Sequence, residues 1–255
     1  MIFDTHAHYD DETFDNDRHD LLAGMKEKGI HIIVNSGASK ESNLLTKKLA
    51  TDFDLVWASF GLHPTYAKEW SDDYLKELED LCNWKRCVAI GEIGLDYYWD
   101  DSTPEEQKVC FEAQMDLAKR LGKPIVVHSR EAAQDTYDIM KNVHAEQLGG
   151  SIHCFSYGKE MARLFVDMGF YIGVGGVVTF KNSRKLKEVV EYLPLESILL
   201  ETDCPYLAPT PFRGKRNDSS MLHYVVEEIS VLKGVSKEVV EEITWQNAMK
   251  LYGLK

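Results

Sequence analysis

Two histidines placed two residues apart near the start of the chain could bind a metal ion together. His6 and His8 follow the apolar residues Ile2 and Phe3, where a first strand is expected to end. In a strand, residues i and i+2 point to the same side, so both imidazoles can reach one cation. Chance alone supplies roughly 0.3 such pairs in a chain with this histidine content. The pair therefore needs support from elsewhere in the sequence.

Four further metal-capable side chains each follow a short apolar run in the same way. They are Glu92, His128, His153 and Asp203. A lone histidine at a strand end is more often a structural group than a ligand. Six such groups gathered at one rim would be costly to hold together without a cation. Taken together, the six residues predict a metal site.

The ligand set is larger than one tetrahedral ion requires if room is to be left for water. It suffices for two ions about 4 Å apart that share a bridging carboxylate. Glu92 is the natural bridge, because each of its oxygens can bind one ion. His6, His8 and Asp203 would then hold one ion, and His128 and His153 would hold the other. Mixed nitrogen and oxygen ligands suit Zn²⁺ or Mn²⁺ and, less well, Mg²⁺.

The residues that must position this site form a series of strand and helix units. Continuous apolar runs, typical of a parallel sheet buried on both faces, predict eight strands. These are residues 2–6, 31–35, 55–61, 87–92, 124–128, 151–154, 170–174 and 198–202. Helical patterns fill the intervals; the clearest begins at Thr103, with Pro104 and Glu106 behind it.

Eight such units predict a (β/α)₈ TIM barrel in a single domain over residues 1–255, with an extra C-terminal helix that begins after Ser236. An open doubly wound sheet is the alternative. It would need a glycine-rich loop after the first strand, and residues 7–10 contain no glycine. In a barrel, all six candidate ligands fall at the carboxyl ends of the strands, where active sites of this architecture lie.

Composition limits the function without naming a substrate. The net charge of −13 argues against broad, non-specific binding to duplex nucleic acid. Five cysteines without a CxxC pair predict reduced thiols and a cytoplasmic protein. No unbroken apolar segment or secretory signal is evident, so we expect no membrane association. We expect a monomer or weak oligomer.

The motifs that surround the candidate ligands resemble those of the TatD family of metal-dependent deoxyribonucleases, within the amidohydrolase-like barrels. The matching stretches are THAH at 5–8, GLHP at 61–64, GEIGLDYY at 91–98, VHSR at 127–130, HCFS at 153–156, ETDCPYLAP at 201–209 and RGKRN at 213–217. They span the chain in the family's order, and all ligand positions match. One departure is Asp218-Ser219, where the family usually has Glu-Pro.

The resemblance implies a hydrolase of phosphodiesters, with 3′→5′ exonuclease action on single-stranded DNA. The residues agree with this chemistry, because two ions activate water and neutralise charge on the attacking and leaving oxygens. Asp203 is predicted to accept the proton as well as to bind metal. Glu201, two residues earlier, points into the same site and would orient a ligand or a water. Alternatively, it is a barrel-interior carboxylate paired with a basic neighbour.

Basic residues at the same rim are candidates for substrate binding. The resemblance implies that His63 contacts phosphate and does not bind metal. Arg130 and the cluster of Arg213, Lys215 and Arg216 could neutralise the phosphates of a bound strand. A solvated run of charge is the alternative for the cluster. The aromatic residues at 97–99 could stack bases or pack beneath their loop.

Two other functions fit the same scaffold. An ester or amide hydrolase, such as a D-aminoacyl-tRNA deacylase, resembles an activity known within the family and would use the same metal chemistry. A non-catalytic, metal-stabilised nucleic-acid-binding module is the third hypothesis. It explains neither a second ion nor coordination positions left open for water.

Overall fold

Eight parallel strands form one sheet in which neighbours along the chain are also neighbours in space, from β1 to β8. The computed structural model describes residues 1–254. The strands are β1 (Ile2–Ala7), β2 (Ile30–Ser36), β3 (Val56–Phe60), β4 (Cys87–Asp96), β5 (Ile125–Arg130), β6 (Gly150–Ile152), β7 (Phe170–Val174) and β8 (Ile198–Leu200). This order is that of a TIM barrel, which confirms the predicted fold class.

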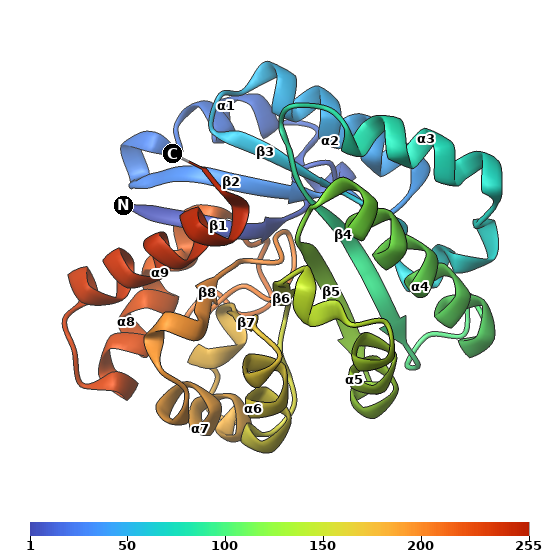
Figure 1. The fold of residues 1–255 in the computed structure, drawn as a ribbon. Coiled ribbons are helices and arrows are strands. Elements are labelled where there is room, and N and C mark those ends of the chain that lie inside the picture. Colours follow the sequence, from blue (N-terminus) through green and yellow to red (C-terminus); the bar gives the residue numbers. More distant parts are fainter. Residues whose placement is uncertain (255) are drawn as a thin grey trace.

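A ring of helices surrounds the strands (Figure 1). They are α1 (Arg18–Ala23), α2 (Lys40–Asp52), α3 (Asp72–Cys82), α4 (Pro104–Leu121), α5 (Ala133–Asn142), α6 (Lys159–Asp167), α7 (Arg184–Tyr192), α8 (Leu222–Lys233) and α9 (Lys237–Tyr252). The helix α9, capped by Ser236, follows the eighth unit, which confirms the extra C-terminal helix. Within residues 1–254, no helix has the length and apolar character needed to cross a membrane.

The fourth strand is longer than the sequence predicts. We expected it to end at Glu92, but β4 continues to Asp96 and pairs with β5, with Gly94 opposite His128 and Asp96 opposite Arg130. All ten residues of β4 are buried. The extension matters for the site. Successive residues of a strand point to opposite faces, so residues 92, 94 and 96 lie on the same face of β4.

The strands β6 and β8 end earlier than predicted. β6 ends at Ile152 and β8 at Leu200, so His153 and Asp203 lie just beyond their strands. The backbone turns there, because Cys154 and Asp203 adopt positive φ values of 45° and 57°. This left-handed conformation interrupts the extended chain and directs the side chains at the rim.

The side chain of Thr5 and the backbone beyond β8 join the last strand to the first. The Thr5 hydroxyl donates to the Leu200 carbonyl at 2.9 Å, and the Asp203 N–H donates to the His6 carbonyl at 3.0 Å. Buried apolar residues from strands and helices fill the space between the sheet and the helical layer. The two ends of the amino-acid sequence therefore meet at one place on the rim.

The predicted start of α4 is confirmed by its cap, in which the Thr103 hydroxyl accepts from the Glu106 N–H while the Glu106 carboxylate accepts from the Thr103 N–H. We expect Thr103→Ala to lower the free energy of unfolding by about 1 kcal/mol, because the Glu106 N–H loses its side-chain acceptor. Thr51→Ala, an exposed position inside α2, is the matched control and should be neutral. Urea denaturation of the two variants measures the difference; equal midpoints would contradict the cap's contribution.

Candidate metal centre

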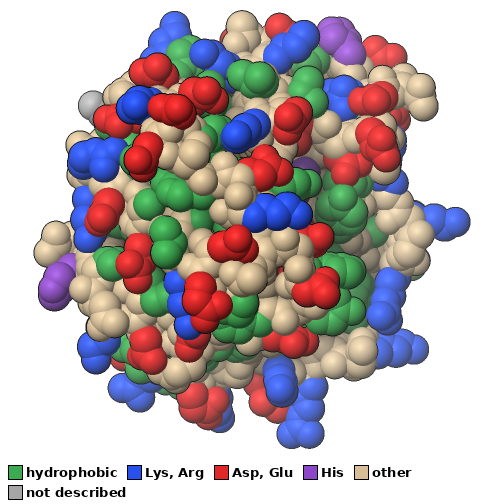
Figure 2. Space-filling view, turned by 90° about the vertical axis from the view of Figure 1, so that its right-hand side faces the viewer, with side chains coloured by type: hydrophobic (Ala, Val, Ile, Leu, Met, Phe, Trp, Pro, Cys, Tyr) green, Lys and Arg blue, Asp and Glu red, His purple; other side chains and the backbone are tan. Residues whose placement is uncertain are grey.

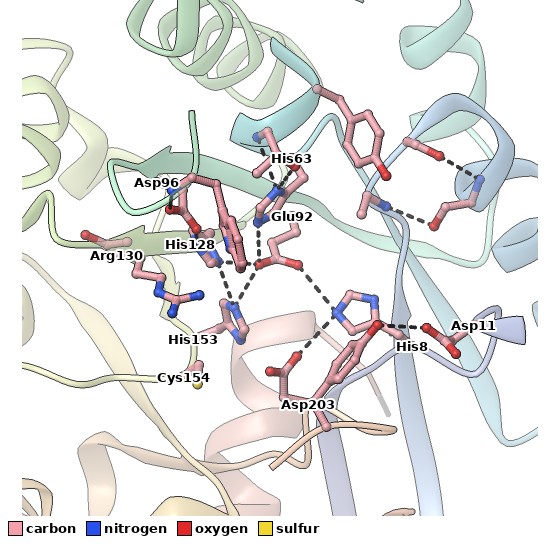
Figure 3. Close-up of a pocket in the computed structure, with 18 of the residues that line it drawn as sticks. His8, Asp11, His63, Glu92, Asp96, His128, Arg130, His153, Cys154 and Asp203 are labelled. Carbon is pink, nitrogen blue, oxygen red and sulfur yellow. Dashed lines mark hydrogen bonds and ion pairs between the residues drawn. The ribbon is translucent and has the colours of Figure 1, made fainter. Parts of the chain in front are cut away.

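Glu92 lies at the centre of a cluster of histidines, and its two carboxylate oxygens face different members (Figure 3). Oε1 lies 2.7 Å from His128 Nδ1 and 2.8 Å from His153 Nε2. Oε2 lies 3.4 Å from His6 Nε2 and 3.5 Å from His8 Nε2. Burial alone would raise the pKa of Glu92, but the surrounding histidines hold it well below its usual range. The side chain is therefore an ionised carboxylate between two groups of imidazoles.

The first group combines the two ends of the chain. The Nε2 atoms of His6 and His8 are 3.0 Å apart, so the two rings face each other as the strand alternation predicts. Asp203 Oδ1 lies 3.8 Å from His6 Nε2 and 3.4 Å from His8 Nε2. These three residues can offer ligand atoms to one ion.

The outer hydrogen bonds of two histidines leave the correct ring nitrogen free for a metal. His8 Nδ1 lies 2.8 Å from the Ser36 carbonyl oxygen, so Nδ1–H donates, and in the neutral ring that binds a metal Nε2 would present its lone pair to the site. His128 is oriented in the reverse sense. Its Nε2–H donates to Asp96 Oδ2 at 2.9 Å, and Nδ1 faces Glu92. Both arrangements suit neutral, metal-binding imidazoles.

His63 differs from His8 and His128, because its outer ring nitrogen accepts a hydrogen bond where theirs donate. Its Nδ1 accepts from the Thr65 N–H at 3.3 Å and lies 2.8 Å from the Thr65 hydroxyl. Burial and the neighbouring His128 lower the pKa of His63 to about 3, so the ring is neutral and carries its proton on Nε2. That N–H lies 3.6 Å from Glu92 Oε1. His63 is thus arranged as a donor, although its position also lies within reach of a metal.

Asp96 is a site residue that the sequence analysis missed. Besides accepting from His128, its Oδ1 accepts from the N–H groups of Tyr98 and Trp99 at 2.9 and 3.1 Å. Burial alone would raise the pKa of Asp96, but the hydrogen bond and charge of His128 lower it. Its spacing of four residues from Glu92 was the available signal. It was overlooked because the strand was expected to end at Glu92.

Glu201 lies behind the histidines and does not line the open pocket. Its carboxylate accepts from the Cys154 N–H, and Oε1 lies 3.9 Å from His153 Nδ1. That Nδ1 is buried without a hydrogen-bond partner. A Cβ atom on Gly173 would lie 2.2 Å from Glu201 Oε2, so only glycine leaves room for this carboxylate. Burial raises the pKa of Glu201 to about 7.

An open pocket of about 890 Å³ leads from the surface to this cluster. Figure 2 looks onto this end of the barrel, and histidine is visible near the centre of the face. Six carboxylates line the pocket: Asp10, Asp11, Glu92, Asp96, Asp101 and Asp203. Among the described residues, Arg130 is the one arginine or lysine that lines it. Without added positive charge, the pocket would repel an anionic substrate.

The predicted basic cluster lies outside the pocket lining. Arg216 donates to both carboxylate oxygens of Asp17, at 2.8 and 2.5 Å, and to the Thr13 carbonyl. Arg213 lies over the ring of Phe180, 4.5 Å from its centroid. Lys215 is exposed. That this cluster binds substrate stays a prediction. Because Arg213, Lys215 and Arg216 lie outside the pocket lining, they could contact only phosphates of a strand that extends beyond the pocket.

The residues present fit a divalent cation. Two Nε2 atoms at 3.0 Å repel each other unless a cation or a proton lies between them, and an ionised Glu92 adjoins both. Burial alone would lower the pKa of His8 and His128, but the carboxylates around them raise these values to about 10 and about 9. The site therefore attracts positive charge, and the nitrogen and oxygen donors are those of transition-metal sites.

Comparisons with known proteins agree over nearly the whole chain. The sequence model of the family described as "TatD related DNase" matches residues 3–253. A Bacillus subtilis protein named "Uncharacterized metal-dependent hydrolase YabD" is 41% identical over 252 residues, which are 99% of each chain. A Pantoea ananatis protein named "3'-5' ssDNA/RNA exonuclease TatD" is 31% identical over 259 residues, with 99% of this chain and 100% of the relative covered.

A solved structure agrees as well. The crystal structure of YjjV, a TatD homologue from Escherichia coli K12, matches with a TM-score of 0.94 and 30% identity. The match covers 100% of this chain and 98% of that chain. Fold, motif order and sequence identity lead to the same assignment. The chain belongs to the TatD family of metal-dependent hydrolases.

Proposed function

We propose that this hydrolase cleaves phosphodiesters with two divalent ions, as a 3′→5′ exonuclease on single-stranded DNA. The observation that carries the proposal is the division of the two Glu92 oxygens between separate histidine groups at the bottom of an open pocket. Such a carboxylate is suited to bridge two ions. The family description and the name of the Pantoea ananatis relative support a nucleic-acid substrate.

The proposed ligands divide into two sets around Glu92. His6, His8 and Asp203 would hold one ion. His128 and His153, whose Nδ1 and Nε2 atoms lie 3.4 Å apart, would hold the other, as Zn²⁺, Mn²⁺ or Mg²⁺. When bound, the ions supply activation of water at neutral pH and neutralise charge on the attacking and leaving oxygens. The protein fixes the imidazoles through Ser36 and Asp96, so that little rearrangement is needed.

Asp203 is the proposed proton acceptor. It lines the pocket, and the His8 hydrogen bond together with nearby histidines lowers its pKa although burial alone would raise it. An ionised carboxylate at this place can accept the proton of the attacking water. Glu201 lies outside the pocket lining, so we propose that it orients His153 from behind and does not accept this proton.

Two side chains are proposed to bind the phosphate. His63 presents an N–H toward Glu92, which suits a donor to a phosphoryl oxygen and does not suit a ligand. Arg130 supplies the one guanidinium of the pocket lining among residues 1–254. A planar guanidinium can bind two phosphate oxygens at once.

We expect the purified chain to bind close to two divalent ions, measured by elemental analysis after dialysis against metal. His153→Ala should lose about one ion because one of the two sets is broken. His19→Ala, an exposed histidine of α1, is the matched control and should bind as the wild type does. Metal addition at pH 7 should also release protons, because His8 and His128 have pKa values of about 10 and about 9 without metal. Wild-type chain that stays metal-free in excess metal would refute the proposed centre.

Asp203→Asn should keep the fold but lose at least about 100-fold in hydrolysis, since an amide does not accept the proton. Its amide oxygen can still bind a cation, so the assay is run with metal in excess. Asparagine tolerates the left-handed backbone found there, where φ is 57°. The assay uses single-stranded DNA labelled at the 3′ or the 5′ end, an aminoacyl-tRNA and a simple phosphomonoester. Turnover that survives in the variant would refute the assigned role.

The same panel tests the substrate. Shortening that starts at the 3′ label of single-stranded DNA supports the proposed nuclease. Release of the amino acid from aminoacyl-tRNA, with intact DNA, would instead favour the deacylase. Both outcomes depend on Asp203, so loss of activity in Asp203→Asn separates this site from a contaminating enzyme.

Arg213→Ala combined with Arg216→Ala should weaken binding of a long single-stranded oligonucleotide and spare metal content. Because these residues lie outside the pocket lining, a dinucleotide should bind unchanged. Loss of two phosphate contacts should reduce the salt dependence of binding by about two charges. Arg120→Ala with Arg163→Ala, on α4 and α6, is the matched control. If affinity for the long strand is unchanged, Arg213 and Arg216 act only in the protein's own contacts.

A further inference from the structure

Two large aromatic side chains stand half-exposed directly after β4, at the mouth of the pocket. Tyr98 is 51% exposed and Trp99 is 50% exposed, and Trp99 lines the pocket. Their rings pack edge to face, with centroids 4.8 Å apart. Exposed aromatic surface is common on proteins, but at the mouth of a pocket it is in reach of whatever the pocket binds.

These side chains are held in place by the site itself. Asp96 Oδ1 accepts hydrogen bonds from the N–H groups of Tyr98 and Trp99, while Oδ2 accepts from His128. One buried carboxylate thus connects the aromatic pair to a histidine of the metal centre. This connection fixes the backbone that bears the two rings relative to His128.

Arg130 completes the group. Its guanidinium carbon lies 3.8 Å from the Tyr98 ring centroid and 5.7 Å from that of Trp99. Asp96 and Arg130 are paired across β4 and β5, and the Tyr97 N–H donates to the Arg130 carbonyl at 2.9 Å. Within residues 1–254, no carboxylate forms an ion pair with Arg130, so its charge is available to a ligand while the stacked ring holds it.

The neighbouring loop adds a second aromatic wall. Tyr66 of η3 (Pro64–Glu69) is 40% exposed and also lines the pocket. The Ser102 hydroxyl joins the two loops, because it donates to the Thr65 carbonyl at 2.9 Å and accepts from the Lys68 N–H at 3.1 Å. Tyr66 and Trp99, from two loops that Ser102 connects, therefore both line the pocket.

The opposite side of the mouth has a different character. Asp10 accepts from Asn35 and from Ser42, and Asp11 accepts from the Tyr206 hydroxyl at 2.8 Å. Asp10 and Asp11 line the pocket, and Figure 3 shows Asp11 and Arg130 on opposite sides of it. Asp10 and Asp11 repel a phosphate chain, and Asp101, in the loop after β4, also lines the pocket. Among the described residues, Arg130 is the one arginine or lysine of the lining, so a phosphate of a bound strand is expected beside it.

We propose that Trp99 and Arg130 form a nucleotide subsite, in which the indole stacks on an unpaired base and the guanidinium binds the adjacent phosphate. The assignment rests on the proposed function and extends it to the substrate's conformation. Stacking on a side chain requires an exposed base face, and stacking between neighbouring base pairs covers that face in a duplex, so the subsite selects single strands. The edge-packed Tyr98 holds both members in position.

The test compares two fluorescent oligonucleotides of equal phosphate number, oligo(dT) and the abasic sugar–phosphate chain. Binding is measured by anisotropy with metal-loaded protein in the Asp203→Asn background, and gel electrophoresis verifies that the strands stay intact. Trp99→Ala should lower affinity for oligo(dT) about tenfold and leave the abasic chain unchanged, since one stacked base is lost. Trp99→Phe should restore most of the affinity.

Two controls separate this subsite from other effects. Tyr192→Ala removes an aromatic side chain that is 49% exposed on α7 and outside the pocket lining, and it should change neither affinity. Arg130→Gln should weaken both oligonucleotides equally, because both carry phosphates. If Trp99→Ala leaves the affinity for both oligonucleotides unchanged, or lowers both equally, the base-stacking assignment alone is overturned. Parent protein that binds neither oligonucleotide would overturn the proposed nucleic-acid substrate as well.

Discussion

Asp4 lies where the end of the barrel returns to its beginning, and its buried carboxylate accepts hydrogen bonds from both sides of this junction. The Thr202 hydroxyl and N–H donate to it at 2.7 and 3.0 Å, the Ser219 hydroxyl at 2.6 Å and the His6 N–H at 3.3 Å. Burial raises the pKa of Asp4 to about 6 in spite of these donors. The junction brings His6 and Asp203 to one ion site, so the chemistry depends on barrel closure.

The charge of the pocket explains why a metal-dependent activity fits this acidic protein. Six carboxylates and one guanidinium line the pocket among the described residues, a balance that disfavours phosphate. Divalent ions reverse that balance locally, because they are the largest charges in such a site. The overall charge of −13 therefore does not conflict with an anionic substrate. The negative overall charge means that an anionic substrate is attracted only by the metal centre and by the few basic side chains at the rim.

The barrel and the cluster could be predicted because both follow from a regular pattern. Apolar runs that end in His, Glu or Asp meet at one rim in any parallel barrel, so distance along the sequence did not matter. Hydrogen-bond partners from other parts of the chain were not predictable in this way. The Ser36 carbonyl that orients His8 and the Asp17 carboxylate that binds Arg216 carry no motif. Asp96 was missed because the end of a buried strand has no sharp sequence signal.

Two buried carboxylates with different partners connect the parts of this site. Glu92 uses its two oxygens to join two histidine groups, and Asp96 uses its own to join His128 to the backbone of the aromatic pair. A carboxylate is suited to this, since each oxygen accepts separately. Asp96 therefore holds His128 and the Tyr98–Trp99 backbone against one buried carboxylate. The residues that face the candidate metal centre and those at the pocket mouth thus share one hydrogen-bonded support, which a site built from independent loops would not provide.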